Sequence, residues 1–510
     1  MSAAAPSTAH RLDDRVRNRR DGTRRGGPRR VPALEVVVMC VVAVALTIGS
    51  LLHKLQCAVP GIDFVSATGK ACFADTVSLF SSRGLGTHVF PYVQPLGENG
   101  LPPGSLEYPT LTGVWAWLSA LPVDSLHGFL VVTALTFVPV VVVTVVGLAL
   151  VAGRRAWFFA ATPPLFLYAL YNWDLLPVAC TVVAVVVAVR WPAGRALVWR
   201  AVVVGALFGL GGAFKFYPLV FVAPFVLALL VDATAAWGDR LRRTAGAVAG
   251  SVGVVLVANV PFVLVEPESW FSIIRYQGIR DIDNATLSVW YYAFQPWSSA
   301  DSPTFQHTLN LLATGATAIA LLAVLVTGLV LGIRRGRVPW IETSAAILCA
   351  YLVANKVDSL QYALWLAPFF VLVRIRTGWI VAYLAANTLL FAGWFRHIHL
   401  QASGTTVRTY ADEALSIGVW AQIILLPILV VVFLRARAVD DDQAVDAHQS
   451  VDAHQAVDAD QAVDPDRATD QGRATDQGPA EEAHPADGEH PAPAAHRTGA
   501  GPSTASPTDV

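Results

Sequence analysis

Long apolar segments separated by short polar stretches occupy most of the chain between residues 33 and 437. About 20 apolar residues in a helix span the hydrocarbon core of a bilayer, so the pattern predicts an all-α polytopic membrane protein. Several segments are shorter than ~17 residues, which predicts tilted, broken or half-spanning helices among them. We therefore expect a bundle of about 12 transmembrane helices, at residues 33–52, 126–152, 156–171, 175–189, 201–214, 218–231, 244–265, 308–333, 338–354, 362–373, 378–395 and 415–434.

The apolar pattern is absent at both ends of the chain. Residues 1–32 carry nine arginines and almost no large apolar residue, which is typical of a disordered basic arm. Residues 438–510 repeat aspartate every six residues and hold no large apolar side chain, so we expect a disordered acidic tail. A cleaved signal peptide is the alternative for residues 33–52, but that run is long and no small-residue cleavage site follows it.

Composition agrees with the apolar pattern, since 55% of residues are hydrophobic and only 14% are charged. An ordinary soluble domain is excluded on this basis. The net charge of -1 conceals an asymmetry, because the tail from residue 438 contains 16 acidic residues and 3 arginines whereas the rest of the chain is basic. The basic residues lie in short connections between apolar segments, which argues against nucleic-acid binding.

Arginine distribution predicts the orientation of the spans. When the segments alternate, most arginines fall on one side, which the positive-inside rule assigns to the cytoplasm. We therefore expect a multi-pass plasma-membrane protein with both termini cytoplasmic. Its external loops would be residues 53–125, 266–307 and 396–413. The arginines in the short connections are Arg154, Arg155, Arg190, Arg195, Arg200, Arg240, Arg242, Arg243, Arg334, Arg335, Arg337, Arg374, Arg376, Arg435 and Arg437.

Cys57 and Cys72 share the first expected external loop. They are able to pair in an oxidising compartment, but the sequence gives no distance between them, so the pairing stays open.

Two of the four lysines, Lys215 and Lys356, lie at breaks between adjacent apolar segments. A lysine at membrane depth either extends to the interface or binds an anion. The glycines before Lys215, together with Pro218 and Asn355, indicate interrupted helices that line a cavity, and this favours anion binding. At the same expected level, Asp174 is either a site residue or the N-cap of the helix that follows it.

The first external loop also holds carboxylates among aromatic residues, of which Asp63 and Asp75 are candidates for a general base. Partial burial would raise the pKa of such a group towards neutrality. A solvated loop aspartate is the alternative.

Five motifs together resemble a known family. Asp75 lies five residues before the aromatic Phe80, and Tyr108-Pro109 opens the next apolar stretch. Asn172 precedes an apolar span, and a glycine-rich segment leads to Lys215 and Pro218. The last motif is Asn355-Lys356-Val with Ser359, Gln361 and Tyr362. In order and spacing the chain resembles the GT-C superfamily of glycosyltransferases that use polyprenyl-phosphate sugars, specifically the GT87-like (DUF2029) mannosyltransferase group of actinobacteria. Leu360, Phe80 and Asn172-Trp173 depart from the residues common in that group.

The resemblance implies a GT-C-like fold and an enzyme that moves a sugar, with mannose favoured, from a polyprenyl-phosphate donor to a lipid or cell-envelope glycan acceptor. Asp75, with Asp63 as the alternative, would be the general base of an inverting transfer. No cofactor is required by the sequence, and a divalent cation stays open. The donor phosphate would be bound by Lys215, Lys356 and Arg280, and the substrate pocket would contain Tyr108, Asn172, Asp174, Tyr217, Asn355, Gln361 and Tyr362.

A polytopic transporter or lipid flippase is the main alternative, because many transporters share the span count and cytoplasmic termini. The sequence shows neither an internal repeat nor a charge pair within the spans, and this favours the enzyme. A membrane scaffold whose tail recruits a partner would leave the external lysines and carboxylates without a role.

Overall fold

The computed structural model describes residues 31–97, 100–192, 196–294, 302–405 and 407–439. The predicted basic arm and acidic tail lie outside these residues, apart from the two residues of each that adjoin the bundle. Within the described part of the chain, helices account for all regular structure, and a single bridge joins Val373 to Ala438. This confirms the all-α class.

Seven helices are long and apolar enough to cross a membrane. They are α2 (Ala33–Leu55), α6 (Leu126–Ala152) with its continuation to Ala160, α10 (Leu197–Phe214), α12 (Trp237–Val265), α15 (Pro303–Arg335), α18 (Thr377–Ala402) and α19 (Tyr410–Arg435). Four shorter apolar helical segments accompany them, comprising α9 (Leu175–Arg190), η3 (Tyr217–Phe221) with α11 (Val222–Val231), α16 (Trp340–Ala354), and η6 (Leu360–Tyr362) with α17 (Ala363–Leu372). The polytopic character is supported, whereas the count of about twelve spans is not confirmed.

The predicted segment at residues 156–171 is broken. It forms the short helices α7 (Trp157–Ala160) and α8 (Pro163–Tyr168), preceded by η2 (Gly153–Ala156). Pro163 and Pro164 follow the first of these helices, and a proline lacks the amide hydrogen that continues a helix. The segment is therefore one of the interrupted helices that the short apolar runs predicted.

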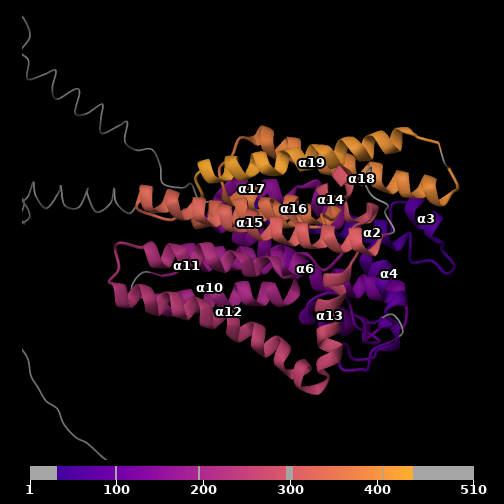
Figure 1. Ribbon diagram of the computed structural model, residues 1–510, viewed down its shortest axis with the longest axis horizontal. Helices are drawn as coiled ribbons and strands as arrows, with labels where there is room; N and C mark the ends of the chain where they lie inside the picture. The colour runs from indigo at the N-terminus through magenta and orange to yellow at the C-terminus, as the bar shows by residue number, and fades with distance from the viewer. Residues whose placement is uncertain (1–30, 98–99, 193–195, 295–301, 406, 440–510) are drawn as a thin grey trace, which may run out of the picture. The chain divides into compact units, whose positions relative to one another are not determined.

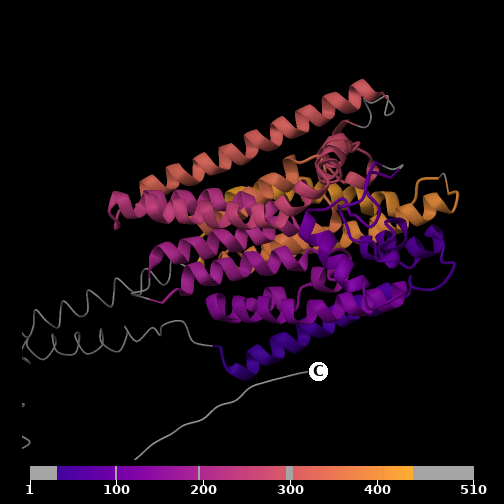
Figure 2. The same cartoon turned by 90° about the horizontal axis from the view of Figure 1, so that it is seen from below.

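The helices of the bundle run in roughly the same direction in Figure 1, where α10 lies beside α12 and α15 beside α16. Helix α13 (Pro267–Ile279) lies across them at one end of the bundle, and it is viewed nearly along its axis in Figure 2. At the same end lie α3 (Phe64–Gly69) and α4 (Asp75–Ser82) of the first loop. The remaining elements are η1 (Leu85–Thr87), α5 (Thr110–Ala120), η4 (Asn284–Thr286) and α14 (Val289–Phe294).

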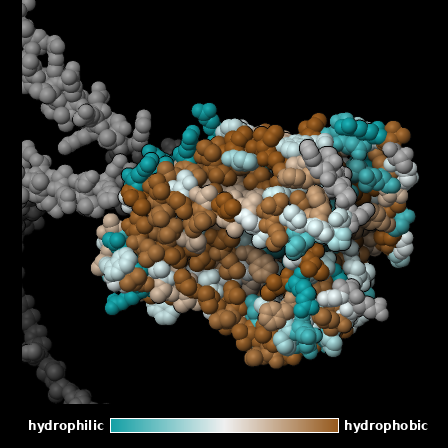
Figure 3. Space-filling model, in the orientation of Figure 1, coloured by the Kyte–Doolittle hydropathy of each residue, from teal (hydrophilic) through white to brown (hydrophobic). Residues whose placement is uncertain are grey.

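Apolar side chains cover much of the outer face of the bundle. In Figure 3 the visible face is largely hydrophobic, and polar residues gather towards its two ends. Helices α12 and α15 contribute exposed residues such as Val257, Leu264 and Ile319, with exposed fractions of 77%, 78% and 70%. A surface of this kind needs an apolar solvent around it, which suits a bilayer.

Close packing of small residues joins α10 to α12. A Cβ atom added to Gly205 would overlap the carbonyl group of Ala247, and one added to Gly209 would approach the carbonyl oxygen of Ser251 to 2.5 Å. Glycine pairs spaced by four residues permit this backbone approach in membrane helices. The two glycines therefore form the helix contact that their spacing predicts.

Basic and acidic residues connect helices at the end of the bundle opposite α13. Arg154 pairs with Glu35 at 2.9 Å, which joins the end of α6 to the start of α2. Arg155 donates hydrogen bonds to the carbonyl groups of Phe370 (2.7 Å) and Val373 (3.1 Å) at the end of α17. Two arginines of one short connection thus join α6 to α2 and to α17 at this end of the bundle.

Candidate functional site

A cavity of about 820 Å³ lies where several helices end, bordered by α4, α10, α13, α16 and η6. Nine of the twelve residues expected at the site line it. The cavity therefore brings together the carboxylate, the cations and most of the polar residues that the motifs indicated from separate parts of the chain. The nine are Asp75, Tyr108, Lys215, Tyr217, Arg280, Asn355, Lys356, Gln361 and Tyr362.

Asp75 is the first residue of α4 and opens onto this cavity. Its Oδ2 atom accepts hydrogen bonds of 2.6 Å from the Tyr108 hydroxyl and 2.6 Å from the Asn172 side-chain amide. No described residue donates a hydrogen bond to the other oxygen, Oδ1. One oxygen is thus fixed by the protein, and the second is available to a molecule in the cavity.

Burial raises the pKa of the Asp75 carboxyl group above its ordinary value, while the Tyr108 hydrogen bond and the charge of Lys215 oppose that rise. A carboxylate with a raised pKa is a stronger base than a solvated aspartate. The environment of Asp75 therefore suits proton abstraction near neutral pH better than that of an exposed loop residue.

Asn172 lies behind the cavity and is fully buried. Its amide nitrogen also contacts the Tyr108 hydroxyl at 2.8 Å, and its Oδ1 accepts a hydrogen bond from the backbone amide of Trp173 at 2.7 Å. The backbone bond fixes which end of the side chain faces Asp75. Asn172 therefore orients the carboxylate from beneath without reaching the cavity itself.

Lys215 follows the last residue of α10, and its side chain is only 8% exposed. Its ammonium group lies 3.4 Å from Oδ1 of Asp174 and 3.8 Å from the centre of the Tyr108 ring. A side chain in this position does not extend to the membrane interface, so the structure favours the cavity over the interface for Lys215. The ion pair lies at the ends of α9 and α10, outside the spans that the sequence predicts.

Asp174 occupies the N-cap position of α9, yet its side chain makes no capping hydrogen bond. Its Oδ1 atom instead accepts from the indole of Trp365 at 2.9 Å, and its buried Oδ2 atom has no partner among the described residues. The interpretation of Asp174 as a side-chain cap is therefore wrong. The residue holds Lys215 from below the cavity, because a buried ammonium group needs a counter-charge.

Three aromatic rings form a stack beside this ion pair. The Trp365 ring lies between those of Tyr217 (4.2 Å between ring centres) and Tyr362 (3.7 Å). Since Trp365 also bonds to Asp174, the stack fixes the carboxylate that holds Lys215. Trp365 was not among the expected site residues. Its position three residues after Tyr362 was the feature of the sequence that could have indicated it as a site residue.

Arg280 and Lys356 differ in how their charges are used. The Lys356 ammonium group donates to the carbonyl groups of Gly278 (3.1 Å) and Arg280 (3.0 Å) and to Oδ1 of Asn310 (2.7 Å), so all three of its protons have acceptors. The Arg280 guanidinium group has no hydrogen-bond or ion-pair partner among the described residues. Arg280 is thus available to an anion in the cavity, whereas Lys356 fixes the end of α13.

The remaining polar residues of the wall come from the break between α16 and α17. Asn355 donates from its side chain to the carbonyl group of Val357 at 2.9 Å and to the hydroxyl of Tyr351 at 3.3 Å, which shapes the turn. The side chain of Gln361 lines the cavity without a partner among the described residues. Gln361 therefore presents an amide that a hydroxyl-rich ligand is able to engage.

Asp63, the alternative base, lies elsewhere. It caps α3 by accepting a hydrogen bond of 2.7 Å from the backbone amide of Ser66, and its side chain is exposed. This hydrogen bond holds the pKa of its carboxyl group below the ordinary value. Asp63 borders a separate hollow of about 570 Å³, away from the three cations. Its geometry is that of a structural cap.

Among the described residues, no three histidine, cysteine, aspartate or glutamate side chains are grouped as metal ligands. Comparison with known proteins gave no match to any family model or to any curated protein. Support for the chemistry of the cavity therefore comes from the residues that line it. They supply a base with one free oxygen, two accessible cations, and amide and aromatic side chains.

Proposed function

We propose that this protein is a membrane glycosyltransferase that moves a sugar from a polyprenyl-phosphate donor to a lipid or cell-envelope glycan acceptor. The fold would be GT-C-like, with about twelve spans in the plasma membrane and both termini in the cytoplasm. The cavity would then open on the external face, opposite the arginine-rich end. Support for this orientation comes from the positive-inside rule.

One observation carries the proposal. The partly buried carboxylate of Asp75 has a free oxygen in the same cavity as Lys215 and Arg280. Glycosyl transfer with inversion needs a base on one side of the sugar and positive charge for the leaving phosphate on the other. A cavity that offers both, at the end of a membrane-embedded bundle, is suited to a donor whose phosphate is attached to a lipid.

In the proposed reaction, Oδ1 of Asp75 removes the proton of an acceptor hydroxyl group. The acceptor oxygen attacks C1 of the sugar, and the bond between C1 and the phosphate oxygen breaks with its electron pair passing to the phosphate. The products are the extended acceptor with inverted configuration at C1, the polyprenyl phosphate, and protonated Asp75. Attack and departure occur on opposite faces of the sugar.

Lys215 and Arg280 would stabilise the leaving group. Negative charge on the phosphate grows as the bond to C1 breaks, so cations held in place before the reaction stabilise the transition state more than the ground state. Lys356 would contribute indirectly, since it holds the backbone of Arg280. Gln361 and Asn355 would contact hydroxyl groups of the sugar.

The lipid part of the donor would leave the cavity past Phe216. This residue lines the cavity and is 53% exposed, so it connects the wall of the site with the apolar outer surface. Mannose is the favoured sugar, and this choice rests on the family resemblance of the motifs alone.

The test uses the purified full-length protein in lipid nanodiscs with radiolabelled polyprenyl-phosphate mannose and a panel of mannoside and lipid acceptors. We expect label transfer by the wild type and its loss in Asp75→Asn, with Asp63→Asn as the matched control. Transfer that persists in Asp75→Asn would overturn the assignment. If the wild type and Asp75→Asn both move the donor across the bilayer of sealed vesicles without transferring sugar to an acceptor, that result would favour the transporter or flippase.

A further inference from the structure

A third lysine lies beside the cavity wall. Lys54, in the last turn of α2, is fully buried. No carboxylate of the described residues lies within 4.0 Å of its ammonium group, and its nearest partners are backbone oxygens and rings. A buried ammonium group without a direct counter-ion is costly, which points to a role for Lys54.

The partners of Lys54 belong to the segment that leads into α4. The ammonium group donates to the carbonyl oxygens of Ala71 (3.3 Å) and Phe73 (3.5 Å). It also lies 5.2 Å from the centre of the Tyr171 ring, and Phe73 and Tyr171 both line the cavity. Lys54 therefore contacts the back of the same wall from which Asp75 projects.

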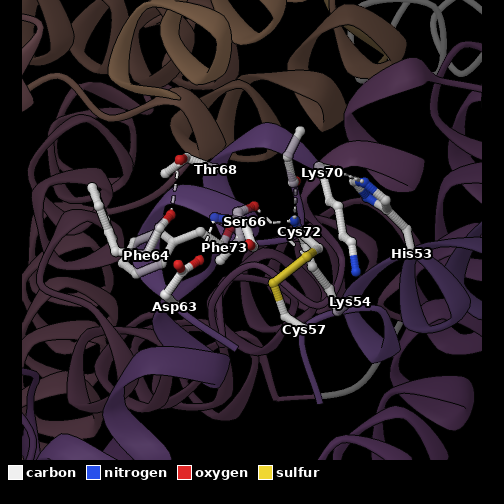
Figure 4. The surroundings of a disulfide bond; sticks show 12 residues. His53, Lys54, Cys57, Asp63, Phe64, Ser66, Thr68, Lys70, Cys72 and Phe73 are labelled. Carbon is white, nitrogen blue, oxygen red and sulfur yellow. Dashed lines mark hydrogen bonds between the residues drawn. A yellow bond between two sulfur atoms is a disulfide. The ribbon is translucent and has the colours of Figure 1, made fainter. Parts of the chain in front are cut away.

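A disulfide bond fastens the same segment to the same helix end. Cys57 and Cys72 are bonded, with their Cα atoms 5.7 Å apart, so the pairing that the sequence leaves open is made (Figure 4). Figure 4 shows the Lys54 side chain beside this bond. Cys57 lies three residues after Lys54. The disulfide therefore holds Cys72, while the Lys54 side chain holds the residues before and after it.

The fastened segment has a conformation that it would not hold by itself. Ala71 has a φ angle of 52°, in the left-handed region that residues with a Cβ atom seldom adopt. Such a conformation persists when the surrounding structure imposes it. Asp75 follows two residues after Phe73, so its place depends on how this segment is held.

We propose that Lys54, together with the Cys57–Cys72 disulfide, is the positioning device for Asp75, and that its ammonium group supplies a second positive charge near that carboxylate besides Lys215. The kinetic consequence of this positioning rests on the proposed function, in which Asp75 is the general base. The contacts of the Lys54 ammonium group with the carbonyl oxygens of Ala71 and Phe73, just before Asp75, support the positioning role independently of any reaction.

The first test needs no enzymatic activity. A hydrophobic carbodiimide reacts with a protonated carboxyl group, and mass spectrometry of the wild type in nanodiscs would measure the labelled fraction of Asp75 between pH 5 and 9. The titratable groups around Asp75 are Tyr108, Lys215, Glu107, Asp174, Lys54 and Tyr171. Only the lysine is changed in each variant, so the other groups form a constant background.

In Lys54→Met we expect roughly three- to tenfold more labelling of Asp75 at pH 7, because loss of a nearby cation favours the protonated acid. Lys54→Arg should label like the wild type. Lys70→Met is the matched control, because Lys70 is an exposed lysine of the same loop. Unchanged labelling in Lys54→Met, or an equal rise in Lys70→Met, would overturn the proposal.

The second test is kinetic and uses the transfer assay. If positioning is the role, Lys54→Met should lower kcat by about 10- to 100-fold while the KM for the donor changes less than about threefold, since the donor cations stay in place. Lys54→Arg should recover most of kcat. Reduction of the disulfide in the wild type should produce the same fall in kcat.

Should Lys54→Met fail to fold, Lys54→Gln keeps a hydrogen-bond donor without the charge and serves both tests. Wild-type kcat in Lys54→Met or in Lys54→Gln would overturn the positioning role. If the wild-type protein is labelled at Asp75 but transfers no sugar, the proposed function is wrong. The labelling of the Lys54 variants still tests whether Lys54 acts on Asp75 in that case.

Discussion

The hydroxyl group of Tyr108 donates a hydrogen bond of 2.6 Å to Asp75. The face of the same tyrosine ring carries the ammonium group of Lys215, 3.8 Å from its centre. One side chain thus separates the proposed base from the proposed phosphate-binding cation and contacts both. This arrangement prevents Lys215 from neutralising Asp75 directly, so both charges remain available to substrates.

Replacing Asp75 is expected to remove activity without unfolding the protein. Asp75→Asn keeps the size of the side chain but cannot accept a proton, so we expect kcat to fall about 10³-fold, within the range for loss of a general base. The transfer assay in nanodiscs measures this. Asp63→Asn should keep full activity and, as an altered cap, lower the Tm only slightly. Equal losses in both variants would contradict the assignment.

Lys215 is expected to affect both stability and rate, and a double variant separates the two. Lys215→Met leaves buried Asp174 without its cation, which costs on the order of 3 kcal/mol and should lower the Tm. Lys215→Met/Asp174→Asn removes both charges and should recover most of the Tm. We expect kcat/KM to stay about 100-fold low in both variants. Recovery of kcat/KM in the double variant would show that Lys215 is only structural.

The pH dependence of transfer should move in a defined direction. Burial raises the pKa of Asp75 and Lys215 lowers it, so removing Lys215 should raise the pKa further. Activity needs ionised Asp75 and is lost as pH falls through this pKa. The acidic limb of the kcat/KM profile should therefore lie above the ordinary aspartate pKa of about 4. It should move to still higher pH in Lys215→Met, and a limb at the same pH would contradict this prediction.

Arg280 and Lys356 should give different defects although both line the cavity. Arg280→Gln removes an unpaired guanidinium group, so we expect the KM for the donor to rise about tenfold with little change in Tm. Arg275→Gln, an exposed position on the same helix, is the control. Lys356→Gln removes three hydrogen bonds and should lower the Tm. A Tm loss in Arg280→Gln without a KM effect would contradict the distinction.

Asp358 provides a test of stability against pH. It lies between α16 and η6, its side chain has no partner among the described residues, and burial raises its pKa to about 8. Since the folded state favours the neutral acid, stability is lost as pH rises from about 4, the ordinary aspartate value, towards 8. Asp358→Asn should therefore raise the Tm at pH 8 and leave it nearly unchanged at pH 4. Thermal unfolding in detergent measures both, and a gain at pH 4 alone would contradict the interpretation.

The sequence predicted where helices break better than it predicted which side chains meet. The glycines, Pro218 and Asn355 mark interruptions that the structure contains, because backbone preferences act locally. Contacts between residues that lie far apart in the chain leave no such local signal. Asp174 and Lys215 are separated by two helical segments, so their ion pair was missed, and the role of Asp174 stayed open between a site residue and an N-cap.

Lys356 and Lys54 show that the sequence around a lysine does not determine its partners. Lys356 resembles Lys215 in sequence context, yet its protons are taken up by Gly278, Arg280 and Asn310. Lys54 ends an apolar helix, where a lysine ordinarily reaches the membrane interface. The return of residues 71–73 over the end of α2, together with the rings of Tyr171 and Phe395, buries it. The function of a lysine thus depends on acceptors that the tertiary fold supplies.

Key residues of the cavity lie where helices begin or end. Asp75 is the first residue of α4, and Lys215, Arg280 and Asn355 directly follow the last residues of α10, α13 and α16. Mutations in these short connections leave the lipid-facing helices untouched. Substitutions at the mouth of the bundle are therefore able to change what the cavity binds while the apolar outer surface is kept. The same division makes chimeras practical, because these connections can be exchanged while the lipid-facing helices are retained.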